Sequence, residues 1–249
     1  MENKKAEVAI ILPNYNSEKF IEGTIKSVLN QNYKNWKLFV IDDSSNFESK
    51  KKLEKYKRFK KIKIFYLKKN KGTAYCRNLG IKKSNSNYIA FLDSDDIWHK
   101  NKLDNQIKFM KKNNYHFTYT YYKTIGLKNK NINTPHKFSF RDFIKDTSIA
   151  TSSMVIKREI LKGIKFENTK ICEDYFFKCQ ILKKIGFAYC LKKYLTKYRI
   201  RKNSLQSNRF KNFYWIWRIN YRFNKLNFID NLSSILSISL NSLKKYGLK

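Results

Sequence analysis

Short apolar runs alternate with helix-length amphipathic segments through the first hundred residues. Phe20, Ile21, Ile25, Val28 and Leu29 recur at the spacing of one helical face, and Gly72 stands where a further helix begins. The runs predicted as strands are Val8–Leu12, Trp36–Ile41, Ile62–Leu67 and Tyr88–Leu92. Strands separated by helices are typical of βαβ units. We therefore expect an α/β fold, with a Rossmann-like, mostly parallel sheet and helices on both faces.

The second half of the chain is less regular. Its predicted elements are strands at Phe117–Tyr122, Ser152–Ile156, Phe187–Leu191 and Tyr194–Ile200, and a helix at Glu173–Ile185. From residue 207 the chain becomes aromatic and basic, and then amphipathic with a helical period. We expect one α/β domain over residues 1–206 and a helical tail over residues 207–249.

Polar clusters follow three of the predicted strands. Asn14 and Tyr15 lie in the loop Pro13-Asn14-Tyr15-Asn16, Asp42 and Asp43 come after the second strand, and Asp93-Ser94-Asp95-Asp96 comes after the fourth. In open α/β sheets, ligands bind at the carboxyl ends of the strands. The three clusters therefore predict one ligand site at that edge.

The Asp93–Asp96 cluster predicts a cation site. Its three carboxylates repel one another unless a cation lies among them. Oxygen ligands suit Mn²⁺ or Mg²⁺, and Mg²⁺ is commonly held by one or two carboxylates together with substrate phosphates. The alternative is a solvated acidic turn that caps the next helix.

The charge of the chain fits two interpretations. Its 249 residues contain 54 Lys and Arg against 19 Asp and Glu, a net charge of +35. Such an excess favours polyanionic partners, but a compositional bias toward Lys, Asn, Ile, Phe and Tyr also explains it. Because the lysines are spread along the chain while acids gather at the predicted site, we expect no nucleic-acid partner.

The cysteine spacing and the apolar segments near both ends of the chain indicate the cellular location. The four cysteines show no metal-ligand or disulfide spacing. No secretory segment precedes the first strand, and the uncharged stretch 231–243 is shorter than the roughly 20 apolar residues of a membrane span. We expect a reduced, cytoplasmic protein, either free or peripheral on the inner face of the membrane.

Four sequence blocks together carry a family resemblance. They read "ILPNYNSEKFIEGTIKSVLNQNYKNWKLFVIDDSS", "KGTAYCRNLGI", "YIAFLDSDDIW" and "CEDYFFKCQIL". In this order and spacing, they resemble the family-2 inverting glycosyltransferases of GT-A fold, bacterial enzymes that use nucleotide-diphosphate sugars. The resemblance runs from about Val8 to about Ser207, and it implies a role in surface polysaccharide biosynthesis.

The resemblance implies roles for residues of the donor site. Pro13 and Tyr15 correspond to the loop that packs against the base, and Asp43 to an acceptor for the base or ribose. Arg77 corresponds to an arginine near the donor phosphates. Asp93 and Asp95 match the family's D-x-D motif, with Asp95 as the direct ligand of Mn²⁺ or Mg²⁺ and Asp93 shared with the donor.

The acid pair Glu173-Asp174 begins a predicted helix, where acids ordinarily stabilise the helix dipole. By resemblance it is the family's "ED" motif, and Asp174 is the catalytic base that takes a proton from the acceptor hydroxyl. Arg201 is a departure, since it stands where the family usually has histidine. The resemblance therefore assigns no phosphate or metal contact to Arg201.

These features together predict a metal-dependent enzyme that transfers a sugar, with a UDP-sugar favoured as donor, to a glycan or lipid-linked oligosaccharide acceptor. Two rival functions are a nucleotidyltransferase acting on sugar phosphates and a basic nucleic-acid-binding protein. The tail fits a helical cap on the domain or an anchor on an anionic membrane surface. The anchor would use Phe213, Tyr214, Trp215 and Trp217 with Arg218, Arg222 and Lys225.

Overall fold

A single large sheet organises the chain. The structure, a computed structural model, describes residues 6–169, 171–202 and 209–247. The strands are β1 (Val8–Asn14), β2 (Trp36–Asp42), β3 (Ile62–Tyr66), β4 (Tyr88–Phe91), β5 (Ile97–Trp98), β6 (Phe117–Gly126), β7 (Asn131–Ile132), β8 (Lys137–Ser139), β9 (Val155–Lys157) and β10 (Phe187–Ile200). The α-helices are α1 (Ile21–Leu29), α2 (Phe47–Glu54), α3 (Thr73–Lys83), α4 (Lys102–Asn113), α5 (Phe140–Phe143), α6 (Glu173–Ile185), α7 (Arg209–Arg222) and α8 (Phe228–Tyr246). Two short 3₁₀ turns span Thr151–Ser153 and Arg158–Leu161.

The strand order confirms a mostly parallel sheet. The order is β3-β2-β1-β4-β9-β6-β10-β5, with β7 and β8 paired to β6 and β10. The first four strands of this order are mutually parallel. β9 is antiparallel to both of its neighbours, so β6 and β10 again run in the direction of β4.

Helices cover both faces of the sheet, as the sequence predicts. Alternate residues of β1 enter two different core clusters. The cluster of Ile10 also contains residues of α1, α2 and α4, whereas the cluster of Ile11 extends through α3 and α6 to α7 and α8. All seven residues of β1 are buried, as expected for a central parallel strand. Gly80 of α3 permits close helix–sheet packing, because a Cβ there would lie 2.5 Å from Ile11 Cγ2.

Several boundaries differ from the sequence-based expectation. Pro13 and Asn14 belong to β1 rather than to a loop. The strand predicted at Ser152–Ile156 is a 3₁₀ turn at Thr151–Ser153 followed by β9. The two strands predicted between 187 and 200 are one strand, β10, with irregular pairing near Leu191 and Tyr194.

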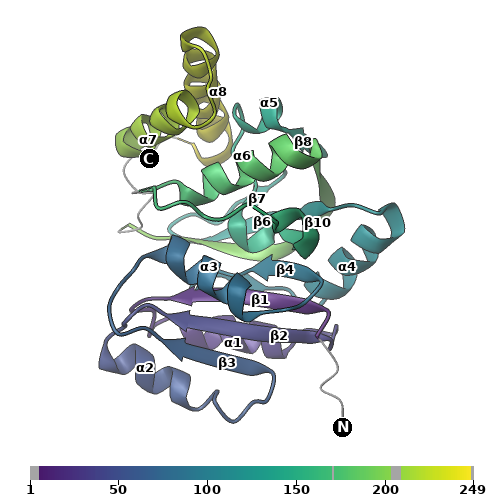
Figure 1. Cartoon of the computed structure of the whole chain (residues 1–249), viewed down its shortest axis with the longest axis vertical. Coiled ribbons are helices and arrows are strands. Elements are labelled where there is room, and N and C mark those ends of the chain that lie inside the picture. Colours follow the sequence, from purple (N-terminus) through teal and green to yellow (C-terminus); the bar gives the residue numbers. More distant parts are fainter. Residues whose placement is uncertain (1–5, 170, 203–208, 248–249) are drawn as a thin grey trace.

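The tail forms two helices beside α5 and α6, at the end of the molecule opposite β3 (Figure 1). Ile216 and Ile219 of α7 and Ile238 of α8 belong to the same buried cluster as the sheet. The expected boundary at residue 206 lies outside the described residues. Among the helices of the described ranges, none is long and apolar enough to cross a membrane.

Candidate active site

The polar clusters predicted from the sequence meet at one edge of the sheet. β1 lies between β2 and β4, where the order of connections reverses, and all three strands run parallel. Asn14 and Asp42 end β1 and β2, and they are paired in register. Asp93 follows β4 by two residues. This edge is the topological switch point at which α/β sheets bind ligands.

Asn14 fixes the loops of this edge. Its Nδ2 donates to Asp42 Oδ2 at 2.8 Å, to Ser45 Oγ at 3.2 Å and to Ser49 Oγ at 3.1 Å. Asp42 Oδ1 accepts from Ser45 N at 3.1 Å, which closes the turn after β2. Asp42 is therefore engaged in holding the loop, and the neighbouring Asp43 is the acid that faces the next loop.

Asp43 joins the end of β2 to the start of α3. Its Oδ1 accepts from Lys71 N at 2.7 Å and its Oδ2 from Gly72 N at 2.8 Å. Gly72, with φ of 85°, has a conformation that favours glycine at the N-cap of α3. Tyr15, the residue that follows β1, is 53% exposed, so its ring is accessible to a ligand. Pro13 is buried in β1.

Arg77 of α3 ties β4 to α6. Its guanidinium donates to Asp93 Oδ1 at 2.8 Å and to Glu173 Oε1 at 3.0 Å, and its side chain is 5% exposed. Burial alone would lower the pKa of Arg77, but Asp93 and Glu173 outweigh it and raise the pKa. Burial raises the pKa of Glu173 despite the neighbouring arginine. Arg77 thus orients one acid from each of two motifs that are 80 residues apart in sequence.

Two arginines of β10 and its continuation approach the Asp95–Asp96 turn. Arg201 Nε lies 2.8 Å from Asp95 Oδ2, and Arg199 donates from Nε to the Asp95 carbonyl at 2.9 Å. The backbone N of Arg199 also donates to Asp96 Oδ1 at 2.8 Å. Both guanidinium groups lie over the ring of Phe20, at 4.7 and 5.4 Å. Arg201, which replaces the usual histidine, therefore contacts an acid of the D-x-D segment.

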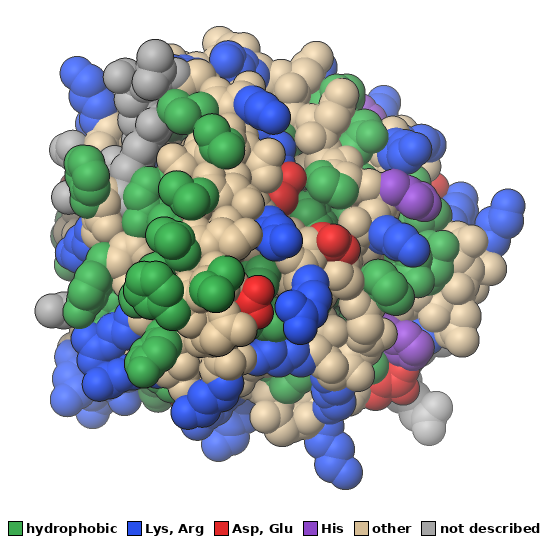
Figure 2. Space-filling view, turned by 90° about the horizontal axis from the view of Figure 1, so that it is seen from above, with side chains coloured by type: hydrophobic (Ala, Val, Ile, Leu, Met, Phe, Trp, Pro, Cys, Tyr) green, Lys and Arg blue, Asp and Glu red, His purple; other side chains and the backbone are tan. Residues whose placement is uncertain are grey.

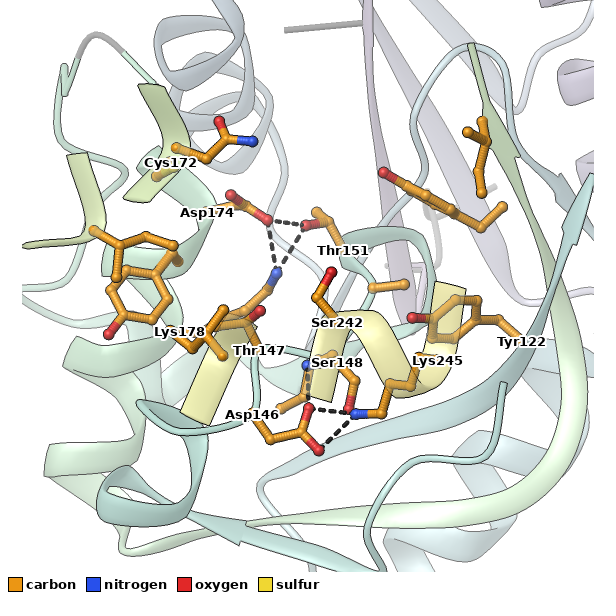
Figure 3. A pocket seen from close by; sticks show the side chains of 18 of the residues that line it. Tyr122, Asp146, Thr147, Ser148, Thr151, Cys172, Asp174, Lys178, Ser242 and Lys245 are labelled. Atoms are coloured by element: carbon orange, nitrogen blue, oxygen red, sulfur yellow. Dashed lines mark hydrogen bonds and ion pairs between the residues drawn. The ribbon is translucent and has the colours of Figure 1, made fainter. Parts of the chain in front are cut away.

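Asp174 lies in the first turn of α6 and is held by two donors (Figure 3). Its Oδ2 accepts from Thr151 Oγ1 at 2.9 Å and from Lys178 Nζ at 2.7 Å. The Lys178 ammonium is also 3.1 Å from Thr151 Oγ1, and its side chain is 3% exposed. Burial acts to raise the pKa of Asp174, but Lys178, Arg77 and the hydrogen bonds outweigh it and lower the pKa below its ordinary value. Asp174 is therefore ionised near neutral pH.

A cavity of about 670 Å³ opens beside Asp174. Its lining includes Arg77, Asp93, Glu173, Asp174, Tyr122 and Lys245, together with residues of α7 and α8. The predicted residues Pro13, Tyr15, Asp43 and Asp95 are not part of this lining. Asp93 thus lies between the Tyr15–Asp43 side of the sheet edge and the cavity that contains Asp174.

The acids after β4 fit a divalent cation. Burial and the neighbouring Asp93 raise the pKa of Asp95, and Arg201 opposes this effect. The raised pKa means that the ionised carboxylate is destabilised at this position, and a bound cation would stabilise it. In the described ranges no three His, Cys, Asp or Glu side chains form a metal cluster. Two carboxylates suffice for Mg²⁺ when phosphate oxygens complete its coordination.

The family of the chain follows from its sequence match. The family described as "Glycosyl transferase family 2" matches residues 9–185, which include β1 except its first residue, the D-x-D segment and the acid pair of α6. The chain is a family-2 glycosyltransferase. The match covers the three strand ends and the helix from which the described site is built.

Two relatives that match most of the chain are also glycosyltransferases. The glycosyltransferase is 32% identical over 250 residues to TuaG of Bacillus subtilis (strain 168), whose name refers to teichuronic acid biosynthesis, covering 98% of this chain and 99% of TuaG. It is 36% identical over 217 residues to WfgD of Escherichia coli, covering 85% and 84% of the two chains. WfgD is named a UDP-Glc:α-D-GlcNAc-diphosphoundecaprenol β-1,3-glucosyltransferase.

A solved structure shares the fold. TarS 1–349 of S. aureus, in complex with UDP-GlcNAc, aligns with a TM-score of 0.76 at 20% identity, over 96% of this chain and 72% of that one. At this identity the likeness concerns the fold alone. It confirms that the glycosyltransferase has the GT-A architecture expected from its sequence.

Sequence reasoning missed two partners of Asp174. Lys178 follows Asp174 by four residues on a helix, and that spacing alone places the two side chains on one face. Thr151 had no such signal, because it is 23 residues before Asp174 in the sequence and belongs to a different element. The contact between Arg77 and Glu173 was equally hidden, since it joins α3 to α6.

Proposed function

We propose that the glycosyltransferase moves one sugar, with inversion, from a UDP-sugar to a hydroxyl of a lipid-linked glycan acceptor in surface polysaccharide synthesis. The observation that carries the proposal is the position of Asp174, an ionised carboxylate at the wall of a cavity whose lining also contains Asp93. Inversion requires a base on the face of the sugar opposite the leaving group, so the base and the donor phosphates belong on different segments.

Asp174 has one oxygen available for the acceptor. Among the side chains of the described ranges, both partners of its carboxylate bind Oδ2, which leaves Oδ1 to accept the proton of the attacking hydroxyl. Lys178 and Thr151 fix the orientation of the group, and orientation of this kind contributes to the rate without further reorganisation. As the hydroxyl oxygen bonds to the anomeric carbon, its proton passes to Asp174 and the nucleoside diphosphate leaves.

The donor side of the proposal uses the other residues of the edge. Tyr15 stacks on the base, an interaction worth roughly 1–3 kcal/mol, beside Pro13, while Asp43 holds the loop that receives the ribose. Asp95 and Asp93 would hold Mn²⁺ or Mg²⁺, and the bound cation would supply charge neutralisation for the leaving diphosphate. Arg77 keeps Asp93 aligned through the 2.8 Å ion pair.

The names of one relative and of one structural neighbour support the proposed substrates. WfgD is named for UDP-Glc and for an acceptor on diphosphoundecaprenol, and the TarS complex contains UDP-GlcNAc. A bilayer-embedded acceptor also supports peripheral action at the cytoplasmic membrane surface. Family membership favours glycosyl transfer over the nucleotidyltransferase and nucleic-acid-binding alternatives.

The Asp174→Asn variant tests the proposal. Transfer from UDP-glucose and UDP-GlcNAc to GlcNAc-diphosphoundecaprenol is measured, and the anomeric configuration of the product is read by NMR. We expect an inverted product, and a loss of about 10²–10⁴-fold in rate in the variant, with UDP binding retained. The matched control is Asp104→Asn, whose carboxylate pairs with Lys108 on α4. A retained anomeric configuration, or full activity of Asp174→Asn, would contradict the proposal.

A further inference from the structure

The tail helices turn a row of large apolar side chains away from the core. Nine of the fourteen exposed large hydrophobic side chains in the described part of the chain lie between residues 210 and 240. We call them the α7–α8 stripe: Phe210, Tyr214, Tyr221, Phe223, Phe228, Ile229, Leu232, Leu236 and Leu240. Leu232, Leu236 and Leu240 are each four residues apart, which aligns them along one face of α8.

The opposite faces of the two helices are firmly packed. Ile216, Ile219 and Ile238 lie in the core cluster. Asn220 Oδ1 accepts from Tyr175 OH at 2.7 Å, and Asn220 Nδ2 donates to Ser234 Oγ at 3.0 Å. The stripe therefore cannot turn inward without breaking buried hydrogen bonds between α6, α7 and α8.

This packing corrects the anchor residues expected from the sequence. Phe213 and Trp215 pack against the core cluster, and Trp217 contacts the ring of Phe228 with centroids 5.5 Å apart. Tyr214 alone among the four expected aromatic residues is exposed, at 57%. The helices thus both cap the domain and expose an apolar face, and that face is formed by different residues.

The charge around the stripe is mainly positive. Residues 209–247 contain seven lysines and arginines and a single acid, Asp230. Arg222 and Lys225 are exposed at the turn between the helices. Figure 2, which looks onto the end of the molecule that carries α7 and α8, shows hydrophobic side chains gathered on one side with lysines and arginines along their border. A second copy of this chain would bring two positive surfaces together, whereas an anionic lipid surface complements both the charge and the apolar row.

We propose that the α7–α8 stripe docks the enzyme on an anionic lipid bilayer, with both helices lying along the membrane surface. The inner face of α8 supports this placement, because Ile238, Asn241, Ser242 and Lys245 line the cavity that contains Asp174. α8 would then separate the lipid from the cavity, and an acceptor carried by a lipid would reach Asp174 by passing this helix. The acceptor path rests on the proposed function, whereas the docking itself does not.

Vesicle sedimentation with the full chain tests the docking. The vesicles are phosphatidylcholine alone and phosphatidylcholine mixed with phosphatidylglycerol. We expect binding to the anionic vesicles, and at least about tenfold weaker partitioning for the double variant Leu236→Asp/Leu240→Asp. Arg222→Glu/Lys225→Glu is expected to weaken binding to anionic vesicles only. Phe47→Asp is the matched control, since Phe47 is 73% exposed on α2, and it should bind like the wild type.

Two results would overturn the proposal. One is equal vesicle binding by the wild type and Leu236→Asp/Leu240→Asp. The other is a wild-type dimer in sedimentation velocity that this double variant dissociates, without binding of either protein to vesicles. Titration with UDP is run on the same proteins. Retained UDP binding with lost vesicle binding separates the docking surface from the donor site, so failure of either proposal is recognised independently.

Discussion

Replacing Lys178 with methionine removes the closest cation from Asp174 while keeping most of the side-chain volume. The ion pair has an N–O distance of 2.7 Å, and the lysine side chain is 3% exposed. Loss of one partner of a buried pair costs about 3–5 kcal/mol, because the other charge stays buried. Asp174 faces the cavity and is 17% exposed, so water offsets part of this cost and we expect about 3 kcal/mol. That corresponds to a fall in Tm of roughly 6–12 °C for a chain of this size.

The Lys178→Met substitution also changes how the stability and the transfer rate depend on pH. The lowered pKa of Asp174 stabilises the folded wild type above the unfolded pKa near 4, and this contribution is lost only as the pH falls through the lowered value. In Lys178→Met, Arg77 is the main remaining charge that opposes the effect of burial on Asp174. The pKa of Asp174 therefore rises relative to the wild type. The stability difference between the two proteins is then largest near pH 7 and narrows at acid pH. The acid limb of the transfer rate moves to higher pH.

Thermal unfolding by circular dichroism and initial rates across pH measure both effects. Lys184→Met is the control, because Lys184 is exposed on the same helix and, among the described residues, donates to the carbonyls of Ile160 and Lys162 and to no carboxylate. We expect the control to stay within about 1 kcal/mol of the wild type. A Lys178→Met protein with wild-type stability and an unmoved acid limb would refute the role given to the ion pair.

Two further substitutions probe the packing behind the site. Arg77→Lys removes the planar group that bridges Asp93 and Glu173, so we expect a loss of about 1–3 kcal/mol in urea unfolding and weaker UDP binding; unchanged values in both assays would contradict this. Gly80→Ala places a Cβ 2.5 Å from Ile11 Cγ2. Overpacking costs about 1–3 kcal/mol and outweighs the roughly 1 kcal/mol gained in helix propensity, so a more stable variant would contradict the packing described.

The sheet edge could be predicted because parallel strands end together. Once Val8–Leu12, Trp36–Ile41 and Tyr88–Leu92 were recognised as strands, the polar residues after them had to meet. The helix at Glu173–Ile185 was predicted with its observed bounds. These elements follow from local periodicity, which the sequence displays directly.

Features set by distant contacts could not be predicted. The segment at Ser152 was expected to be extended, but its carbonyl accepts from Trp98 Nε1 at 2.7 Å and its hydroxyl accepts from Asp93 N at 3.0 Å. These partners hold a 3₁₀ turn there. Lys192 and Lys193 looked like a break between two strands, yet β10 continues through them because its pairing with β6 shifts register instead.

The most direct test of the donor site is calorimetric titration with UDP, GDP and dTDP, with and without Mn²⁺. The proteins are the wild type, Asp95→Asn and the control Asp104→Asn. We expect UDP to bind the wild type and Asp104→Asn only when Mn²⁺ is present, and we expect Asp95→Asn to lose that binding. UDP binding that is indifferent to Mn²⁺ or retained in Asp95→Asn, or absence of binding by every nucleotide, would contradict a metal-dependent nucleotide-sugar site at this edge.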